Sequence, residues 1–96
     1  MTINRVILVG NVAGEPHVDT TARPTTRLRV TTTVDPDTAE QHAISVRGRL
    51  GEICALYCRD GVRIYLEGRL HTRADGTAEI RAETVKILQP RPKPGQ

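Results

Sequence analysis

Aromatic side chains are nearly absent from this sequence. Neither Trp nor Phe occurs among the 96 residues, and Tyr57 and Tyr65 are the two aromatic residues. A binding site that uses several aromatic rings is therefore excluded. The length allows one domain with a small hydrophobic core.

Long hydrophobic runs and cysteines are scarce as well. No segment approaches the roughly 20 apolar residues of a membrane-spanning helix, and residues 2–5 lead directly into an expected strand without a signal peptide. We therefore expect a cytosolic chain with no membrane partner. Cys54 and Cys58 lie four residues apart on an expected helix, and no further ligands converge on them. We expect two small buried thiols there and no metal site.

Excess charge is small. The net charge is +3, but Arg91 and Lys93 lie in the last eight residues, so residues 1–88 carry a net charge of +1. Twelve of the fourteen basic residues are arginine. The charge total is thus a weak signal, and the direction in which the arginine side chains point matters more.

Catalytic groupings are missing too. His42 has no nucleophile or paired carboxylate near it in the sequence, and no glycine-rich phosphate loop occurs. We expect neither an enzyme nor a bound cofactor.

Hydrophobic alternation dominates what is present. Between Val62 and Arg73, apolar and polar residues alternate with the period of a half-buried strand. Near the N-terminus, Val6 and Leu8 point one way while Ile7 and Val9 point the other. A strand that is apolar on both faces is central or is covered by a partner chain.

A helical period interrupts this alternation once. Leu50, Ile53, Cys54 and Tyr57 follow the spacing of one helix face, and Asp60-Gly61 stands where the helix would end. This helix is about three turns long and would be marginal alone, so it must pack on the sheet.

The complete pattern is five strands with this short helix between the third and the fourth. The expected strands are Asn4–Ala13, Thr25–Val34, Ala43–Arg47, Val62–Arg73 and Thr77–Leu88, the last with a bulge near Glu83-Thr84. Residues 19–24 and 35–41 are expected loops, and Ala74-Asp75-Gly76 is an expected hairpin turn. The pattern is typical of an all-β oligonucleotide-binding (OB) barrel in residues 1–88, followed by a disordered, proline-rich basic tail in residues 89–96.

The residues that fill this pattern resemble a known family. Residues 4–11 (NRVILVGN) with Glu15-Pro16, and the block from His42 to Arg73, are similar to bacterial single-stranded-DNA-binding proteins. The similarity covers nearly all of residues 3–88. It implies an OB fold, subunits joined through the first strand, and usually a tetramer.

The departures from the family pattern are equally informative. The family usually stacks bases on aromatic residues at three places, where this chain has Gln41, Arg47 and Ala74-Asp75. Many members also carry a long tail with an acidic tip that recruits other replication proteins, whereas this sequence ends at Lys93-Pro94-Gly95-Gln96. Because base–aromatic stacking contributes about 1–3 kcal/mol per base, the three changes could lower affinity by several powers of ten.

Arginine can replace part of this affinity, since its guanidinium group stacks on bases and pairs with phosphate. The resemblance places Arg49 and Arg73 along the nucleic-acid path and matches Arg5 to a usually basic position. The candidate DNA-binding residues are Arg5, Arg27, Arg29, Arg47, Arg49, Arg69 and Arg73. The alternative for these arginines is a solvated strand surface.

Four residues are candidates for an oligomer interface. Ile7 and Val9 would be exposed in a monomer, and the resemblance places His42 and Tyr65 at contacts between subunits. Tyr65 could instead stack on a base, and His42 could be a polar group of the core. We expect a dimer or a tetramer.

Two functions remain open. The first is sequence-independent binding of single-stranded DNA in replication, recombination or repair, mainly through arginine–phosphate contacts, by a protein associated with the nucleoid. The second is an oligomeric OB-fold interaction module of the replication-restart accessory type, which binds nucleic acid weakly or not at all. Other replication proteins are possible partners in either case.

Overall fold

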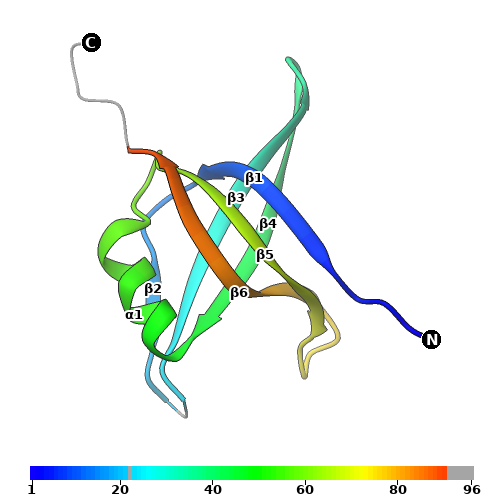
Figure 1. Ribbon diagram of the computed structural model, residues 1–96, viewed down its shortest axis with the longest axis vertical. Helices are drawn as coiled ribbons and strands as arrows, with labels where there is room; N and C mark the ends of the chain where they lie inside the picture. Colours follow the sequence, from blue (N-terminus) through cyan, green and yellow to red (C-terminus); the bar gives the residue numbers. More distant parts are fainter. Residues whose placement is uncertain (22, 91–96) are drawn as a thin grey trace.

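A closed β-barrel forms the body of the molecule in the computed structural model, which describes residues 1–21 and 23–90 (Figure 1). Its strands pair in the order β1-β5-β6-β4-β3, and β3 pairs with β1 to complete the circle. Their bounds are β1 Val6–Val12, β3 Thr25–Asp35, β4 Thr38–Arg47, β5 Arg63–Thr72 and β6 Ala78–Gln89. The helix α1 (Gly48–Tyr57) lies between β4 and β5. The predicted OB barrel, with one helix between its third and fourth strands, is confirmed.

Alternation along the strands builds the core. The inward residues of β3, β4 and β5 are fully or almost fully buried, and each such aliphatic side chain stabilises the fold by about 1.5–3 kcal/mol. These core residues are Leu28, Val30, Ile44, Val46, Ile64 and Leu66. The intervening residues point outward, so the outer surface of the same strands is free to carry polar side chains.

The first strand has to bend, because it pairs with β5 along most of its length and with β3 at Asn11 and Val12. Gly10 lies at this bend, where a Cβ atom would come within 2.3 Å of the Thr31 carbonyl oxygen. A glycine is therefore required for this close approach. Val6 and Leu8 pack against the core, while Ile7 and Val9 are exposed.

A bulge divides the outer face of the barrel. Glu67 pairs with Thr84 and Gly68 with Ala82, so Glu83 has no partner in β5, as the phase slip in the sequence predicted. On one side of the bulge, Tyr65 and Glu67 lie opposite β1. On the other side, Arg69 lies opposite Arg81. The bulge thus separates two outer surfaces of different chemistry.

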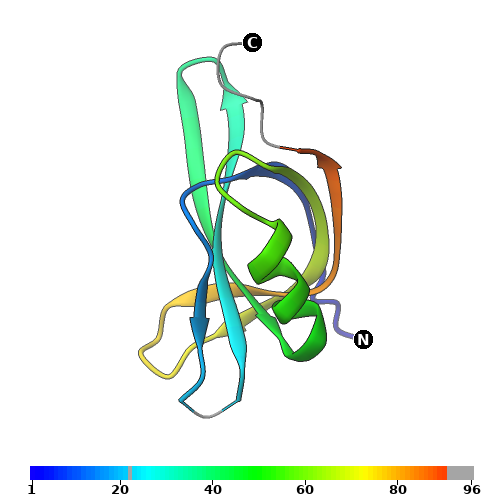
Figure 2. The ribbon, with the colours of Figure 1, turned by 90° about the vertical axis from the view of Figure 1, so that its left-hand side faces the viewer.

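The helix packs on β3, β4 and β6, as Figure 2 shows, and Leu50 and Cys54 of the predicted face lie against the core. Gly51, Cys54 and Cys58 are buried, whereas Ile53 and Tyr57 are 43% and 59% exposed. The prediction was wrong for Ile53 and Tyr57, because Gly51 lets the helix approach so closely that a Cβ atom there would lie 2.3 Å from the Val46 carbonyl oxygen. The helix is therefore turned toward its smallest residues.

The two cysteines are free and buried, as expected. A hydrogen bond with Cys58 and burial both raise the pKa of the Cys54 thiol. Within the described residues, no group of three His, Cys, Asp or Glu side chains could hold a metal ion.

Three further features differ from the predictions. The predicted loop over residues 35–41 is wrong, because residues 38–41 extend β4 and Asp35 ends β3. These two strands therefore form a long hairpin that projects from the barrel (Figures 1 and 2). A short strand, β2 (His17–Asp19), pairs with β3 where none was expected. Leu70 has the same phase in the alternation of residues 62–73 as the buried Val62, Ile64 and Leu66, yet it is 53% exposed because it lies beyond the bulge near the strand end.

The predicted tail begins at Gln89, which is still the last residue of β6. Residues 91–96 of that tail lie outside the described residues. No helix among the described residues has the length and apolar character needed to cross a membrane.

Candidate functional site

A row of polar side chains runs across the outer face of the barrel on five strands. His17 of β2 pairs with Arg27 of β3, which pairs with Ser45 of β4. Ser45 in turn pairs with Arg81 of β6, and Arg81 with Arg69 of β5. Directly paired residues project from the same face of a sheet. Three arginines from distant parts of the sequence therefore meet on one surface, which we call the arginine row.

Two grooves lie along this row. The larger, about 480 Å³, includes Arg27, Arg29 and Arg73 in its lining, together with the connection between β1 and β2 at Ala13 and Gly14. The smaller, about 380 Å³, is lined by Arg27, Arg47, His71, Arg73, Ala74, Asp75, Glu79 and Arg81. Of the seven arginines predicted from the sequence, Arg27, Arg29, Arg47 and Arg73 line the grooves, and Arg69 is in the row.

Acidic side chains neutralise part of this charge. Glu79, which is 5% exposed, forms an ion pair of 2.9 Å with Arg27, and Arg69 lies 3.9 Å from Glu83. Within the described part of the chain, Arg29, Arg47 and Arg73 have no ion pair. The two grooves together are lined by five arginines and three acidic residues, so the surface keeps a net positive charge.

One acidic residue of the smaller groove is held in its ionised form. The side-chain hydroxyl and the backbone N–H of Thr77 both donate to Asp75, at 2.6 and 2.9 Å. These hydrogen bonds keep the pKa of Asp75 below its usual value. Asp75 therefore sets one negative boundary of the groove and would repel a phosphate placed against it.

Arg81 is the member of the row that sequence reasoning missed. Burial, together with the nearby charges of Arg47 and Arg69, lowers the pKa of its guanidinium group. Its outward direction follows from strand alternation, because Ile80 and Ala82 on either side of it are buried. The residues that surround Arg81 could not be predicted from the sequence, because they depend on the parallel pairing of β4 with β6.

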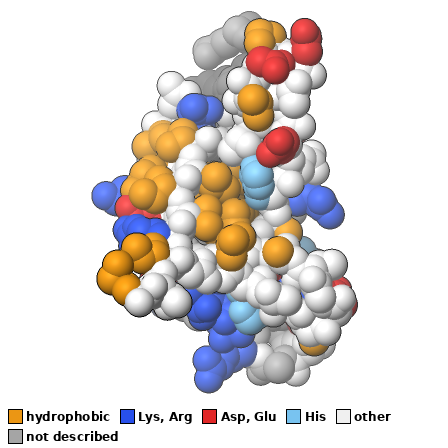
Figure 3. Space-filling model, turned by 90° about the vertical axis from the view of Figure 1, so that its right-hand side faces the viewer, with side chains coloured by type: hydrophobic (Ala, Val, Ile, Leu, Met, Phe, Trp, Pro, Cys, Tyr) orange, Lys and Arg blue, Asp and Glu red, His pale blue; other side chains and the backbone are white. Residues whose placement is uncertain are grey.

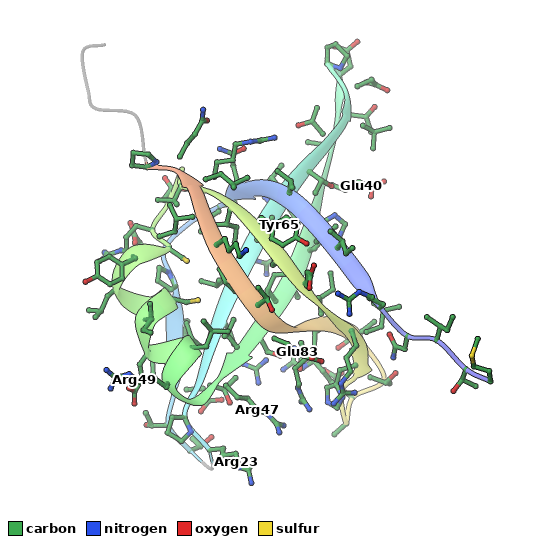
Figure 4. All side chains as sticks on the ribbon, viewed as in Figure 1. Arg23, Glu40, Arg47, Arg49, Tyr65 and Glu83 are labelled. Carbon is green, nitrogen blue, oxygen red and sulfur yellow. The ribbon has the colours of Figure 1, made fainter. Side chains whose placement is uncertain are left out.

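Two of the predicted arginines lie away from the row. Arg5 forms an ion pair of 2.8 Å with Glu67 on the other outer surface. Arg49 lies on the first turn of α1, highly exposed and 3.9 Å from Glu52. In Figure 4, Arg47 and Arg49 project in different directions from the end of the molecule where β4 meets α1.

The positions at which the family usually places aromatic residues all carry other side chains at the surface. Gln41 lies on β4 next to His42 at a third, smaller hollow. Arg47, Ala74 and Asp75 all line the smaller groove. Any ligand held in this groove would therefore meet charged and small side chains rather than rings.

A second outer surface carries three of the four predicted interface residues, Ile7, Val9 and Tyr65. Ile7 and Val9 of β1 lie opposite Glu67 and Tyr65 of β5, and both apolar residues are exposed. The Tyr65 hydroxyl donates to Glu67, which lowers the pKa of that carboxyl and raises the pKa of the tyrosine. Tyr65 is thus near the apolar residues of β1 and distant from Arg47 (Figure 4).

His42 lies elsewhere on β4. It is half-buried, and its Nε2 atom shares a hydrogen bond of 2.8 Å with the Thr32 hydroxyl.

Hydrophobic side chains also gather on the right-hand side of the molecule, which faces the viewer in Figure 3. The predicted interface residues therefore occupy positions distinct from the arginine row.

The sequence is similar to those of known proteins. The model of the single-strand binding protein family matches residues 3–88. A single-stranded DNA-binding protein of Bacteroides thetaiotaomicron is 32% identical over 95% of this chain and 69% of its own length. For the proteins of that name from Rhizobium meliloti and Xanthomonas campestris, the identities are 32% and 33%, over 92% and 86% of this chain. The chain spans 59% and 56% of the lengths of these two relatives.

Solved structures show the same fold. A mitochondrial single-stranded DNA binding protein from S. cerevisiae matches with a TM-score of 0.83 and 17% identity, over 94% of this chain and 98% of its own. A small single-stranded DNA-binding protein from Streptomyces coelicolor matches with a TM-score of 0.79 and 23% identity, over 91% and 94% of the two chains.

Proposed function

The chain belongs to the single-strand binding protein family, and we propose that it binds single-stranded DNA of any sequence, mainly through contacts between arginines and phosphates. The observation that carries this proposal is the arginine row with its two grooves, which five arginines line. A continuous basic groove is the form of site that follows a nucleic-acid backbone. Phosphate contacts carry no sequence information, so base identity should matter little.

The scarcity of rings supports the arginine–phosphate mode. Gln41, Arg47 and Ala74-Asp75 stand where the family usually stacks bases, and Tyr65 lies on the other outer surface. Each missing stacking contact would remove about 1–3 kcal/mol. Binding should therefore be weaker and more dependent on salt than in members that are rich in aromatic residues.

The cellular role and the assembly form part of the same proposal. Single strands arise in replication, recombination and repair, so this function places the protein at the nucleoid in the cytoplasm. The exposed Ile7 and Val9 on β1 favour a dimer or a tetramer joined through that strand, because a monomer would leave this apolar surface in water.

Binding of a labelled single-stranded oligonucleotide across a salt series tests the proposal. For single strands, log K falls with log salt by about 0.7 for each phosphate contacted. If four to six arginines of each subunit bind phosphate, the slope is roughly −3 to −4 per bound subunit. Oligonucleotides of different base composition should give similar constants. Tight binding that is insensitive to salt would contradict the arginine–phosphate mode.

Ion pairs of the arginines predicted to bind DNA, inside and outside the row, favour one alternative. Arg5, Arg27, Arg49 and Arg69 each lie within 4.0 Å of a glutamate, so a large share of the positive charge is already neutralised. A chain of this kind would serve as an oligomeric interaction module that binds DNA weakly. Absence of binding even at low salt would favour this module and reject single-strand binding.

A further inference from the structure

Arg81 lies in the arginine row between Ser45 and Arg69. Its Nε atom is shielded from solvent, and the described residues supply no hydrogen-bond partner for it. The hydroxyl of its neighbour in β4, Ser45, is buried and unpaired as well. Buried polar atoms without a protein partner are rare in folded proteins, and an ordered water or a bound ion usually satisfies them.

The charges around Arg81 favour an anion beside it. Arg27, Arg47 and Arg69 are all close enough to disfavour its charged form, and Glu79 alone among the nearby acids opposes them. Glu79 is already engaged in an ion pair with Arg27. A guanidinium group in this environment gains more than an exposed one from an added anion, because partial burial reduces screening by water.

We propose that the smaller groove is a seat for one phosphate group of the bound strand and that Arg81 is its central ligand. This inference rests on the proposed function and names one fixed contact within it. Arg27, Arg47 and Arg73 line the same groove and supply the surrounding positive charge. A guanidinium group binds a phosphate through two parallel N–H donors, a geometry that a lysine ammonium group lacks.

The lining of the groove also indicates that it holds phosphate and not a base. It contains arginines, two acidic residues, His71 and Ala74, and neither of the two tyrosines. Arg27, Arg47, His71, Glu79 and Arg81 of the lining lie on strands, whereas residues 73–75 belong to the turn between β5 and β6, so most of the seat is built on strands. A rigid support of this kind fixes the position of one phosphate and thereby sets the register of the strand on the protein.

The Arg81→Lys variant tests the seat, because it keeps the charge and removes the paired donors. We expect its Kd for an oligo-dT at low salt to rise about tenfold, while thermal unfolding stays close to that of the wild type. Arg63→Lys is the matched control, since Arg63 pairs with Asn11 and Gln89 away from the row. This control should bind like the wild type. Equal binding by Arg81→Lys and the wild type would overturn the seat and leave the proposed function standing, whereas a wild type that binds no DNA would reject both.

A second oligonucleotide separates phosphate from base contacts. We compare the affinity of Arg81→Lys with that of the wild type for an abasic oligomer that has the same phosphodiester backbone. The loss of affinity in the variant should be the same factor for this oligomer as for oligo-dT. A loss confined to oligo-dT would place a base against Arg81 and contradict the proposal. Should the variant fail to fold, the Nε–H resonance of Arg81 in the wild-type protein supplies the test. It should shift when either oligomer binds, and an unchanged resonance in the bound state would refute the contact.

Discussion

Arg47 is the residue at which the chemistry of this site departs most directly from the family pattern. It stands at the end of β4, exposed and without an ion pair among the described residues, and it lines the smaller groove. An aromatic residue is usual at this position in the family. The side chain is therefore well placed either to neutralise a phosphate or, if it were replaced by a ring, to carry a base.

We predict that Arg47→Trp binds single-stranded DNA more tightly than the wild type, although a positive charge is lost. The ring adds about 1–3 kcal/mol of stacking. The lost exposed ion contact contributes up to about 1 kcal/mol. Affinity should rise severalfold, and the salt slope should flatten by roughly 0.7. Titrations at two salt concentrations check this, with Arg63→Trp as a control that should gain nothing. Weaker binding at both salt concentrations would show that Arg47 contributes through a contact that a ring cannot replace.

Glu79 is the counterpart of Arg47, because it puts a negative charge at the centre of the same surface. It lines both grooves, is 5% exposed, and holds Arg27 at 2.9 Å. The ion pair fixes the direction of Arg27, but the carboxylate also repels any phosphate in the groove. Its two effects act in opposite directions on stability and on binding.

We therefore predict that Glu79→Gln lowers the free energy of unfolding and raises DNA affinity. Loss of the charged partner of Arg27 should cost about 1–3 kcal/mol. A 1 kcal/mol change shifts the melting temperature of a domain of this size by about 4–8 °C. Thermal unfolding and DNA titration at low salt measure the two effects. Glu52→Gln, which alters an exposed pair on α1, should change neither. A drop in affinity would mean that orientation of Arg27 outweighs the repulsion.

At the scale of elements, the alternation of the strands could be predicted from the sequence, whereas the contacts between elements could not. The bulge at Glu83 and the inward faces of β3 and β5 followed from local periodicity. The orientation of α1 did not, since Gly51 contributes no hydrophobicity to a periodic pattern yet forms the closest contact. Arg81 was missed because its surroundings form only when β4 pairs with β6, which local periodicity does not reveal.

Gly51 provides the test of this interpretation of the helix. Replacing glycine with alanine usually stabilises a helix by about 1 kcal/mol. Here the added Cβ would lie 2.3 Å from the Val46 carbonyl oxygen, and overpacking costs about 1–3 kcal/mol or more. We predict that Gly51→Ala lowers the free energy of unfolding in urea by up to about 2 kcal/mol, the largest difference between these two terms. Glu52→Ala on the exposed side of the same turn should be neutral or slightly stabilising. A stabilised Gly51→Ala variant would show that α1 can move away from β4.

At the scale of the whole molecule, the barrel presents two outer surfaces separated by the bulge. The arginine row lies on one, and Ile7, Val9 and Tyr65 lie on the other. This separation allows subunits to join through β1 while the arginine row of each subunit stays accessible to DNA. It also explains why Arg5, which the sequence placed with the DNA-binding arginines, lies beside the apolar surface.

We predict that Ile7→Glu dissociates the oligomer into monomers. Ile7 is 55% exposed in the single chain, so the glutamate should leave the barrel itself intact. Burial of its unpaired charge between subunits would cost several kcal/mol. Light scattering at tens of micromolar protein measures the change in mass. The matched control, Leu56→Glu on the exposed side of α1, should leave the mass unchanged. A wild type that is itself monomeric at this concentration would contradict the proposed assembly.

The parallel pairing of β4 with β6 has a consequence for the motions of the barrel. Two residue pairs, Ile44 with Ile80 and Ser45 with Arg81, join these strands, whereas β3 and β4 pair along most of their length. A short seam opens at a lower free energy than a long ladder, so its amide hydrogens should exchange with solvent earlier. The arginine row crosses this seam. A DNA strand bound there ties the two edges together, and it should slow exchange at the seam more than anywhere else in the barrel.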